Sequence, residues 1–229
     1  MVSIMYKCCI FDLDGTLVNS IYAIQKSVND TLSYWNMREI SVEESRLYVG
    51  DGYKKLLERS LIACGDTELT HYEEAVERYQ DVFRKCCMYR VEAYQGIREL
   101  LEFLKSHGIF IAVLSNKPHP RTLDNVEGVF GSGYFDLVYG EREDKGIKKK
   151  PCPDGIWAIA GELGLAKGEI LYLGDTNTDM ETGDNAKVDT VGVTWGFRTR
   201  EELMAFHPAL IADQPSQVLR YIKDVNGIE

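Results

Sequence analysis

The feature that most constrains the fold is an alternation of short apolar runs with amphipathic stretches of helical length. The apolar runs that suit buried strands span residues 6–11, 109–114, 135–139, 170–173, 190–194 and 210–212. Between them, apolar residues recur at helical spacing, as at Ile97, Leu100, Leu101 and Leu104. Strands that alternate with helices form βα units, so the chain is predicted to be an α/β protein with a parallel sheet.

One long segment interrupts this alternation. Between residues 21 and 90 no run reads as a strand, and helical patterns occupy 21–35, 42–49, 54–63 and 68–89. We therefore expect a helical domain inserted after the first strand. The predicted division is a catalytic core made of residues 1–18 and 91–229, with a cap made of residues 19–90.

Charge and cysteine usage narrow the class of protein. The formal net charge of −10 disfavours nonspecific binding to nucleic acid or an anionic membrane. No run of 18 apolar residues indicates a membrane span, and the first residues lack the features of a signal peptide. The six cysteines do not show zinc-ligand spacing and are expected to be free thiols. We expect a cytoplasmic monomer or homodimer.

An acidic motif follows the first apolar run directly, with the sequence FDLDGT at residues 11–16. The carboxyl ends of parallel strands form the ligand crevice of such sheets. Asp12 and Asp14 at this position favour a bound cation, because two close carboxylates are costly to ionise together. Oxygen ligands suit Mg²⁺, which bridges to phosphate. The alternative for this motif is an Asx turn that caps the next helix.

Three later motifs follow other predicted strands and offer complementary groups. Ser115 and the amide of Asn116 suit phosphate oxygens, although they suit a helix N-terminus equally. Lys150 stands in a proline-rich loop and could offset carboxylate charge, while a solvated surface loop is the alternative. Asp175 could complete a metal site and Asp179 could orient Lys150, unless both merely begin a helix.

The four motifs together resemble those of the haloacid dehalogenase (HAD) superfamily. They are FDLDGT at 11–16, LSN at 114–116, KPCPD at 150–154 and GDTNTD at 174–179. The resemblance covers nearly the whole chain and implies a doubly wound, Rossmann-like core with an inserted α-helical cap. Within the superfamily the chain looks most like the phosphoglycolate phosphatase branch. This implies a Mg²⁺-dependent phosphatase of small phosphorylated metabolites, with phosphoglycolate as the best single guess.

The resemblance also implies the roles of the motif residues. Asp12 would attack phosphorus and become an aspartyl phosphate, while Asp14 would move protons at the leaving group and at water. An acid at the position of Asp14 is typical of the family's phosphatases and is absent from its dehalogenases. Ser115 and Lys150 would act with these two in catalysis.

The remaining ligands are implied in the same way. The metal ligands would be Asp12, Asp14 through its main-chain carbonyl, Asp175 and Asp179. Backbone and side-chain groups of Gly15, Thr16 and Asn116 would hold the substrate phosphate.

In the cap, the string YVGDGYK at 48–54 resembles the family's substrate-specificity loop. Gly50 would allow close approach of a ligand, and Lys54 would meet a substrate carboxylate; a simple turn between two helices is the alternative. The aromatic residues of the cap helices, Tyr79 among them, are expected to be core.

Three other activities stay open at this point. A sugar-phosphate mutase such as a β-phosphoglucomutase, or a pyrophosphatase, would use the same four motifs. A phospho-accepting signalling domain also clusters aspartates with a lysine and Mg²⁺. Its phospho-accepting residue follows a later strand, however, and its length is about half that of this chain.

Overall fold

The computed structural model describes residues 6–228, whose centre is a six-stranded sheet in the order β5-β4-β1-β6-β7-β8. The strands are β1 (Cys8–Phe11), β4 (Phe110–Pro118), β5 (Leu137–Glu141), β6 (Ile170–Gly174), β7 (Asp189–Val193) and β8 (Leu210–Ala212). Every neighbouring pair is parallel, and the chain extends the sheet from β1 in both directions. The predicted doubly wound parallel sheet is confirmed, and its crevice is expected at the carboxyl end of β1.

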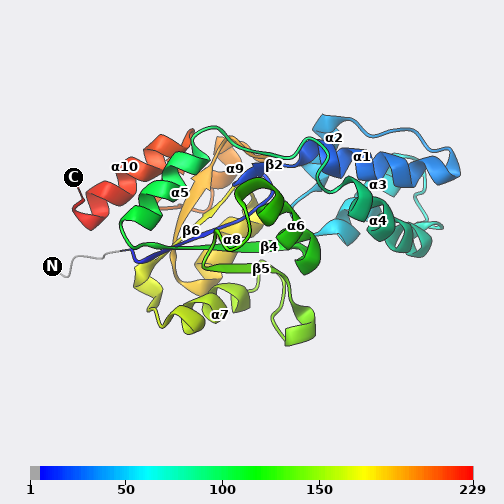
Figure 1. Cartoon of the computed structure of the whole chain (residues 1–229). Coiled ribbons are helices and arrows are strands. Elements are labelled where there is room, and N and C mark those ends of the chain that lie inside the picture. The colour runs from blue at the N-terminus through cyan, green and yellow to red at the C-terminus, as the bar shows by residue number, and fades with distance from the viewer. Residues whose placement is uncertain (1–5, 229) are drawn as a thin grey trace.

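Alternate residues of each strand face opposite sides of the sheet, and each side has its own apolar core. In β1, Cys9 and Phe11 belong to one cluster of buried residues, while Cys8 and Ile10 belong to the other. The first side is covered by α5 (Ile97–Ser106), α6 (His119–Phe130) and α10 (Pro215–Asn226), and the second by α7 (Asp154–Leu163) and α8 (Asn177–Ala186). Figure 1 shows α5 and α10 on one side of the sheet and α7 on the other. The short helix α9 (Arg200–Met204) contacts β7 and β8.

A separate group of helices lies beyond one end of the sheet (Figure 1). It consists of α1 (Ile21–Leu32), the short helix η1 (Ser33–Trp35), α2 (Val42–Tyr48), α3 (Tyr53–Ala63) and α4 (Tyr72–Cys86). These helices share an apolar core of their own, to which α4 contributes Ala75, Tyr79 and Phe83 from one face. We propose that residues 19–90 form a cap domain, as the sequence predicts.

Two details of the fold differ from the sequence-based expectation. A two-stranded antiparallel ribbon pairs β2 (Val18–Asn19) with β3 (Glu92–Ala93) where the chain passes between the sheet and the helices. Strands of two residues are too short to show a period, so the sequence did not predict them. In addition, β4 extends beyond the expected end at Leu114 to Pro118, with an irregular register over its last residues. The LSN motif therefore lies inside the distorted end of a strand.

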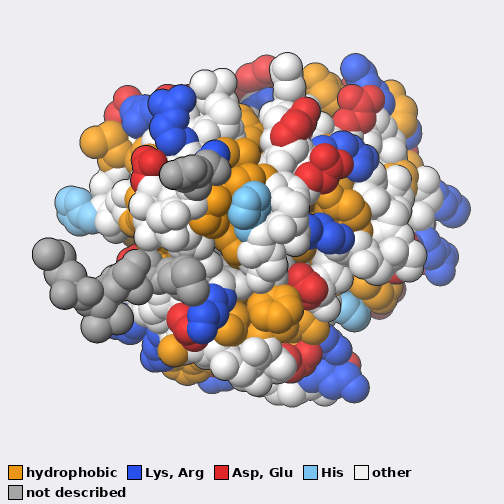
Figure 2. All heavy atoms as spheres, turned by 60° about the vertical axis from the view of Figure 1, so that its left-hand side comes forward, with side chains coloured by type: hydrophobic (Ala, Val, Ile, Leu, Met, Phe, Trp, Pro, Cys, Tyr) orange, Lys and Arg blue, Asp and Glu red, His pale blue; other side chains and the backbone are white. Residues whose placement is uncertain are grey.

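One face of the molecule shows how its charged side chains are distributed. Figure 2 shows the face that carries the chain termini, where basic and acidic side chains are intermixed. No single-sign patch that would suit a polyanion is visible on that face. Within residues 6–228, no helix has both the length and the apolar character that crossing a bilayer requires.

Candidate active site

Three of the predicted site residues lie at the carboxyl ends of three neighbouring strands, β4, β1 and β6. Asp12 follows β1, and its backbone N–H donates to the carbonyl oxygen of Leu173 in β6 at 2.8 Å. Ser115 lies near the end of β4, and Asp175 directly follows β6. Since β4 and β6 both pair with β1, the sheet itself brings these side chains together.

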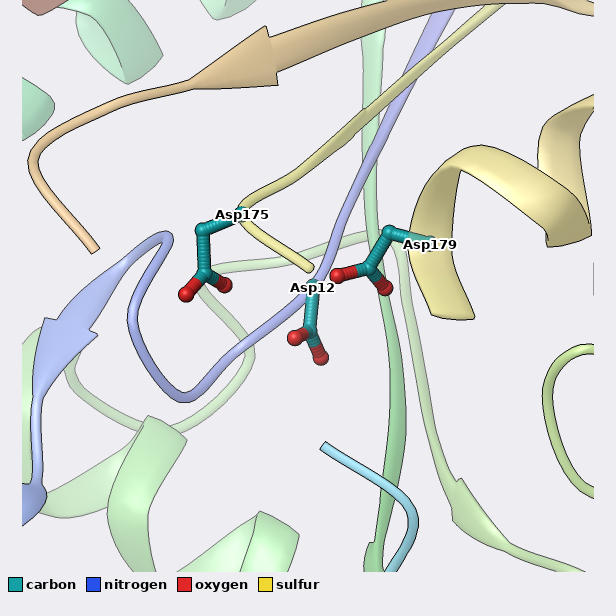
Figure 3. Close-up of side chains that lie close together, drawn as sticks. All are labelled: Asp12, Asp175 and Asp179. Carbon is teal, nitrogen blue, oxygen red and sulfur yellow. The ribbon is translucent and has the colours of Figure 1, made fainter. Parts of the chain in front are cut away.

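Three buried carboxylates gather at this point. Oxygen atoms of Asp12, Asp175 and Asp179 all lie within 4.8 Å of one another. Figure 3 shows the three side chains turned toward a common space from the ends of β1 and β6 and from the first turn of α8. An all-oxygen donor set of this kind is what Mg²⁺ prefers.

Asp175 is held by groups from two other segments of the chain. The hydroxyl of Thr16 donates to its Oδ1 at 3.0 Å, and the backbone N–H of Phe197 donates to its Oδ2 at 2.8 Å. Gly15 has a φ of +86°, and a Cβ built there would lie 2.2 Å from Oδ2 of Asp175. Gly15 and Thr16 were expected to bind substrate, but the structure instead places them against Asp175, and neither lines the cavity described below.

Lys150 joins two of the carboxylates. Its Nζ lies 2.8 Å from Oδ1 of Asp12 and 2.7 Å from Oδ1 of Asp179, and the lysine side chain is 4% exposed. Asn116 fixes the backbone of this lysine: its Oδ1 accepts from the Lys150 N–H at 2.9 Å, and its Nδ2 donates to the Lys150 carbonyl at 3.0 Å. The Asn116 side chain therefore positions Lys150, and the surface-loop alternative for Lys150 is wrong.

Asp179 accepts hydrogen bonds on both carboxylate oxygens. Oδ1 accepts from Lys150 and from the hydroxyl of Tyr172 at 2.8 Å. Oδ2 accepts from the hydroxyl of Thr176 at 2.7 Å and from its backbone N–H at 3.0 Å. These bonds include the capping box that begins α8, so Asp179 both caps this helix and orients Lys150.

The electrostatics of the cluster call for a cation. Burial, followed by the charge of Asp179, raises the pKa of Asp12 to about 7. Burial and the charges of Asp179 and Asp12 raise the pKa of Asp175 well above its usual range. For Asp179 burial acts in the same direction, but the charge and the hydrogen bond of Lys150 outweigh it, and the pKa is lowered. One lysine therefore does not balance three carboxylates, and a divalent metal would supply the missing charge.

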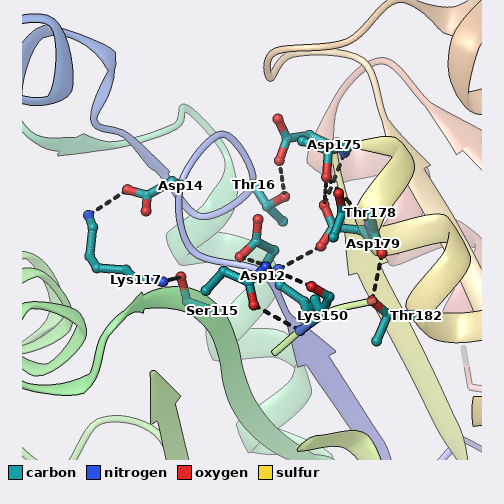
Figure 4. A network of polar contacts seen from close by, with 12 residues as sticks. Asp12, Asp14, Thr16, Ser115, Lys117, Lys150, Asp175, Thr178, Asp179 and Thr182 are labelled. Carbon is teal, nitrogen blue, oxygen red and sulfur yellow. Dashed lines mark hydrogen bonds and ion pairs between the residues drawn. The ribbon is translucent and has the colours of Figure 1, made fainter. Parts of the chain in front are cut away.

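Asp14 faces away from the three-carboxylate cluster and has its own cationic partner (Figure 4). Nζ of Lys117 lies 2.6 Å from Oδ1 of Asp14, with the lysine side chain 5% exposed, and Ser20 donates to the same oxygen. Lys117 also donates to Asn125, whose Nδ2 donates to the carbonyl of Cys87 at the end of α4 at 2.7 Å. Lys117 directly follows the LSN motif, but no local pattern in the sequence indicates its pairing with Asp14.

A cavity lies between the cap and this edge of the sheet. Its core side is lined by Asp12, Asp14, Ser115, Asn116, Lys117, Pro118, Lys150, Thr176 and Phe197. Its cap side is lined by Ile24, Val49, Gly50, Gly52, Tyr53, Leu56, Tyr79 and Phe83.

The cavity lining includes one of the two cap residues predicted to meet substrate, Gly50, and not the other, Lys54. Gly50 lies in the lining with a φ of +119°. Lys54 does not: Tyr53 and Leu56 turn the inner face of α3 toward the cavity, which leaves Lys54 exposed on the outer face. Tyr79, which was expected to be core only, is buried in the cap core and lines the cavity as well.

Comparisons with known proteins identify the family of the chain. Residues 9–193 match the family described as haloacid dehalogenase-like hydrolase. The phosphoglycolate phosphatase of Aquifex aeolicus (strain VF5) is 31% identical, with 93% of this chain and 95% of that protein covered. The phosphoglycolate phosphatase of Haemophilus influenzae (strain ATCC 51907 / DSM 11121 / KW20 / Rd) is 29% identical, with 93% and 97% covered. A solved haloacid dehalogenase-like family hydrolase of Streptococcus pneumoniae has a TM-score of 0.83 and 26% identity, with 96% of this chain and 99% of that chain covered.

Proposed function

The chain belongs to the haloacid dehalogenase-like hydrolase family, and we propose that it is a Mg²⁺-dependent phosphatase acting through an aspartyl phosphate on Asp12. The observation that carries this proposal is the position of Asp12, which lies in one cluster with the Asp175 carboxylate and in an ion pair with Lys150. Asp12 and Lys150 both line a cavity whose other wall is formed by cap residues. The names of the relatives support a phosphate monoester as the substrate. The family match also favours a hydrolase over a phospho-accepting signalling domain.

The proposed reaction has two steps. An oxygen of Asp12 forms a bond to phosphorus while the bond from phosphorus to the ester oxygen breaks, and the Asp14 carboxyl gives its proton to the departing alkoxide. Asp14 then takes a proton from the water that attacks the aspartyl phosphate, which releases inorganic phosphate and restores Asp12. The pairing of Asp14 with buried Lys117 holds the carboxyl at the cavity wall.

The three clustered carboxylates, Asp12, Asp175 and Asp179, are assigned different roles. We propose that Asp12, Asp175 and the main-chain carbonyl of Asp14 hold Mg²⁺, which when bound neutralises charge on the phosphoryl oxygens. Each oxygen of Asp179 accepts two hydrogen bonds, one of them from the Lys150 ammonium, whereas each oxygen of Asp175 accepts one. We therefore assign Asp179 to orienting Lys150 rather than to the metal. Lys150 and the Ser115 hydroxyl line the cavity beside Asp12, where they can hold phosphoryl oxygens.

The test is phosphate release from acetyl phosphate and from a panel of phosphate monoesters that includes phosphoglycolate. We expect the purified protein to release phosphate with Mg²⁺, to stop in EDTA and to recover when Mg²⁺ is added in excess. Asp12→Asn should reduce release to background with an unchanged circular dichroism spectrum. Asp184→Asn, which alters a carboxylate whose side chain is 75% exposed, is the matched control and should keep full activity. Turnover by Asp12→Asn close to that of the wild type would refute the proposal.

A further inference from the structure

The cap side of the active-site cavity has no charged side chain among the described residues that line it. The basic side chains of the lining are Lys117 and Lys150, both from the core. Lys117 is paired with Asp14, and Lys150 with Asp12 and Asp179. No cation in this lining is therefore available for a negative charge on the alcohol portion of a substrate.

The charged groups just outside the lining are exposed or already engaged. Arg198, beside Gly50, donates to the backbone carbonyls of Arg46 and Val49 at 2.6 and 2.7 Å. Lys54 is exposed on the outer face of α3. Arg59 is bound to Asp51 at 2.5 Å and to the carbonyl of Tyr48 at 2.8 Å. In the adjoining groove, Arg84 and Arg121 lie 2.7 and 3.0 Å from Asp81 and Asp124, respectively.

In place of a cation, the cap contributes a stack of three aromatic rings, from Tyr53, Tyr79 and Phe83, which we call the aromatic ladder. The rings of Tyr53 and Tyr79 are nearly parallel, with centroids 5.7 Å apart and an interplanar angle of 7°. The rings of Tyr79 and Phe83 follow at 5.3 Å and 10°. Lys117 lies 5.3 Å from the centroid of Phe83, so the ladder ends beside the ion pair of Lys117 and Asp14. All three rings line the cavity.

We propose that this site selects phosphate monoesters whose alcohol portion is uncharged and has a flat apolar face, and that it discriminates against those whose alcohol portion carries a carboxylate. This inference rests on the proposed phosphatase function and deepens it by naming a substrate class. An uncharged ring packs against the aromatic ladder and buries its face. A carboxylate in the same place is desolvated without a cationic partner from the lining, next to a site that already contains several carboxylates.

The experiment compares kcat/KM for three esters of alkyl alcohols. Benzyl phosphate supplies a flat apolar ring, 2-hydroxyethyl phosphate supplies a small uncharged group, and phosphoglycolate supplies a carboxylate of similar size to the second. We expect kcat/KM to fall in that order, by about tenfold or more from the first to the last. Equal values, or a higher value for phosphoglycolate, would overturn the inference.

Variants of the neighbouring residues Tyr53 and Lys54 test whether charge at the cavity wall decides the preference between benzyl phosphate and phosphoglycolate. Tyr53→Lys places a cation at the cavity wall and should raise kcat/KM for phosphoglycolate relative to benzyl phosphate, whereas Tyr53→Met should lower kcat/KM for benzyl phosphate without that gain. Lys54→Met changes an exposed cation outside the cavity and should alter neither value. A loss of phosphoglycolate hydrolysis in Lys54→Met would show that Lys54 serves the substrate and would refute the inference.

Hydrolysis of acetyl phosphate distinguishes a failure of the phosphatase proposal from a failure of the proposed substrate class. This small acyl phosphate carries no carboxylate and no ring, so its hydrolysis does not depend on the aromatic ladder. If acetyl phosphate is hydrolysed in an Asp12-dependent manner while phosphoglycolate is the preferred ester, the phosphatase stands and the substrate class is wrong. If neither acetyl phosphate nor any ester is hydrolysed, the proposed function fails and the substrate class fails with it.

Discussion

Replacing Lys150 with methionine tests the charge balance of the site without touching a carboxylate. In the wild type, Nζ of Lys150 lies 2.8 Å from Asp12 and 2.7 Å from Asp179, and all three side chains are at least nine-tenths buried. Methionine is about as long as lysine and leaves no large cavity, so the change removes mainly the charge. Two buried carboxylates then face each other without their ammonium partner.

The expected loss of stability is large. Removing one member of a buried ion pair typically lowers the free energy of unfolding by about 3–5 kcal/mol. For a urea m-value of about 3 kcal/mol/M, this corresponds to a midpoint that falls by about 1–2 M. The adjacent Lys149 provides the control, because its ion pair with Glu141 is partly exposed, with both side chains 22% exposed. Lys149→Met should lower the free energy of unfolding by no more than about 1 kcal/mol.

The loss of stability in Lys150→Met should depend on pH, and the direction of that dependence follows from the pKa values of the two carboxylates. Without Lys150, burial and mutual repulsion raise the pKa values of Asp12 and Asp179 in the folded state above their unfolded values. The folded variant then binds more protons than the unfolded chain, so its stability falls as pH rises and recovers as pH falls. The gap between wild type and Lys150→Met should therefore be wider at about pH 8 than at about pH 5.5 when both are unfolded by urea in EDTA. A gap as small as that of Lys149→Met, or one that does not change with pH, would refute this reasoning.

Two further predictions concern the metal site. Gly15→Ala should abolish activity and lower the melting temperature more than Gly133→Ala does, because both glycines have positive φ but only the Gly15 Cβ would meet Asp175, at 2.2 Å; equal effects in activity and melting assays would contradict the close approach. Since the pKa of Asp12 is raised to about 7, the metal-free protein holds a proton there at low pH and loses stability as pH rises. Mg²⁺ should therefore raise the melting temperature more at about pH 8 than at about pH 6, and a shift independent of pH would argue against metal binding at this carboxylate.

The core of the site was predictable because its residues are tied to strand ends. A run of buried residues that ends in a polar motif fixes both the strand and the edge of the sheet where its functional group lies. This is why Asp12, Ser115 and Asp175 could be placed at one edge of the sheet from the chain alone. In the structure Asp12 and Asp175 belong to one carboxylate cluster, and Ser115 lines the same cavity as Asp12. The paired hydrogen bonds between Asn116 and Lys150 depend on how two loops meet, which no local pattern specifies.

The cap was less predictable for a physical reason. Amphipathic spacing tells which face of a helix is buried, but not whether that face covers a core or a cavity. Tyr79 and Phe83 do both, because one face of α4 packs into the cap core while part of the same rings lines the cavity. Lys54 was assigned to the substrate from its place near Gly50 and Gly52, but a helix begins at Tyr53 and rotates the lysine outward.

The short ribbon of β2 and β3 has a consequence for how this architecture can change. It holds the outgoing and returning strands of the chain side by side, with Val18 paired to Ala93 and Asn19 to Glu92. The segment inserted between these strands is therefore connected covalently to the core at two positions that lie side by side. Replacing it by a shorter or unrelated module would close a loop across neighbouring residues and leave the order of the parallel strands intact. New specificities can then arise by exchange of the module, while the machinery beneath it is inherited unchanged.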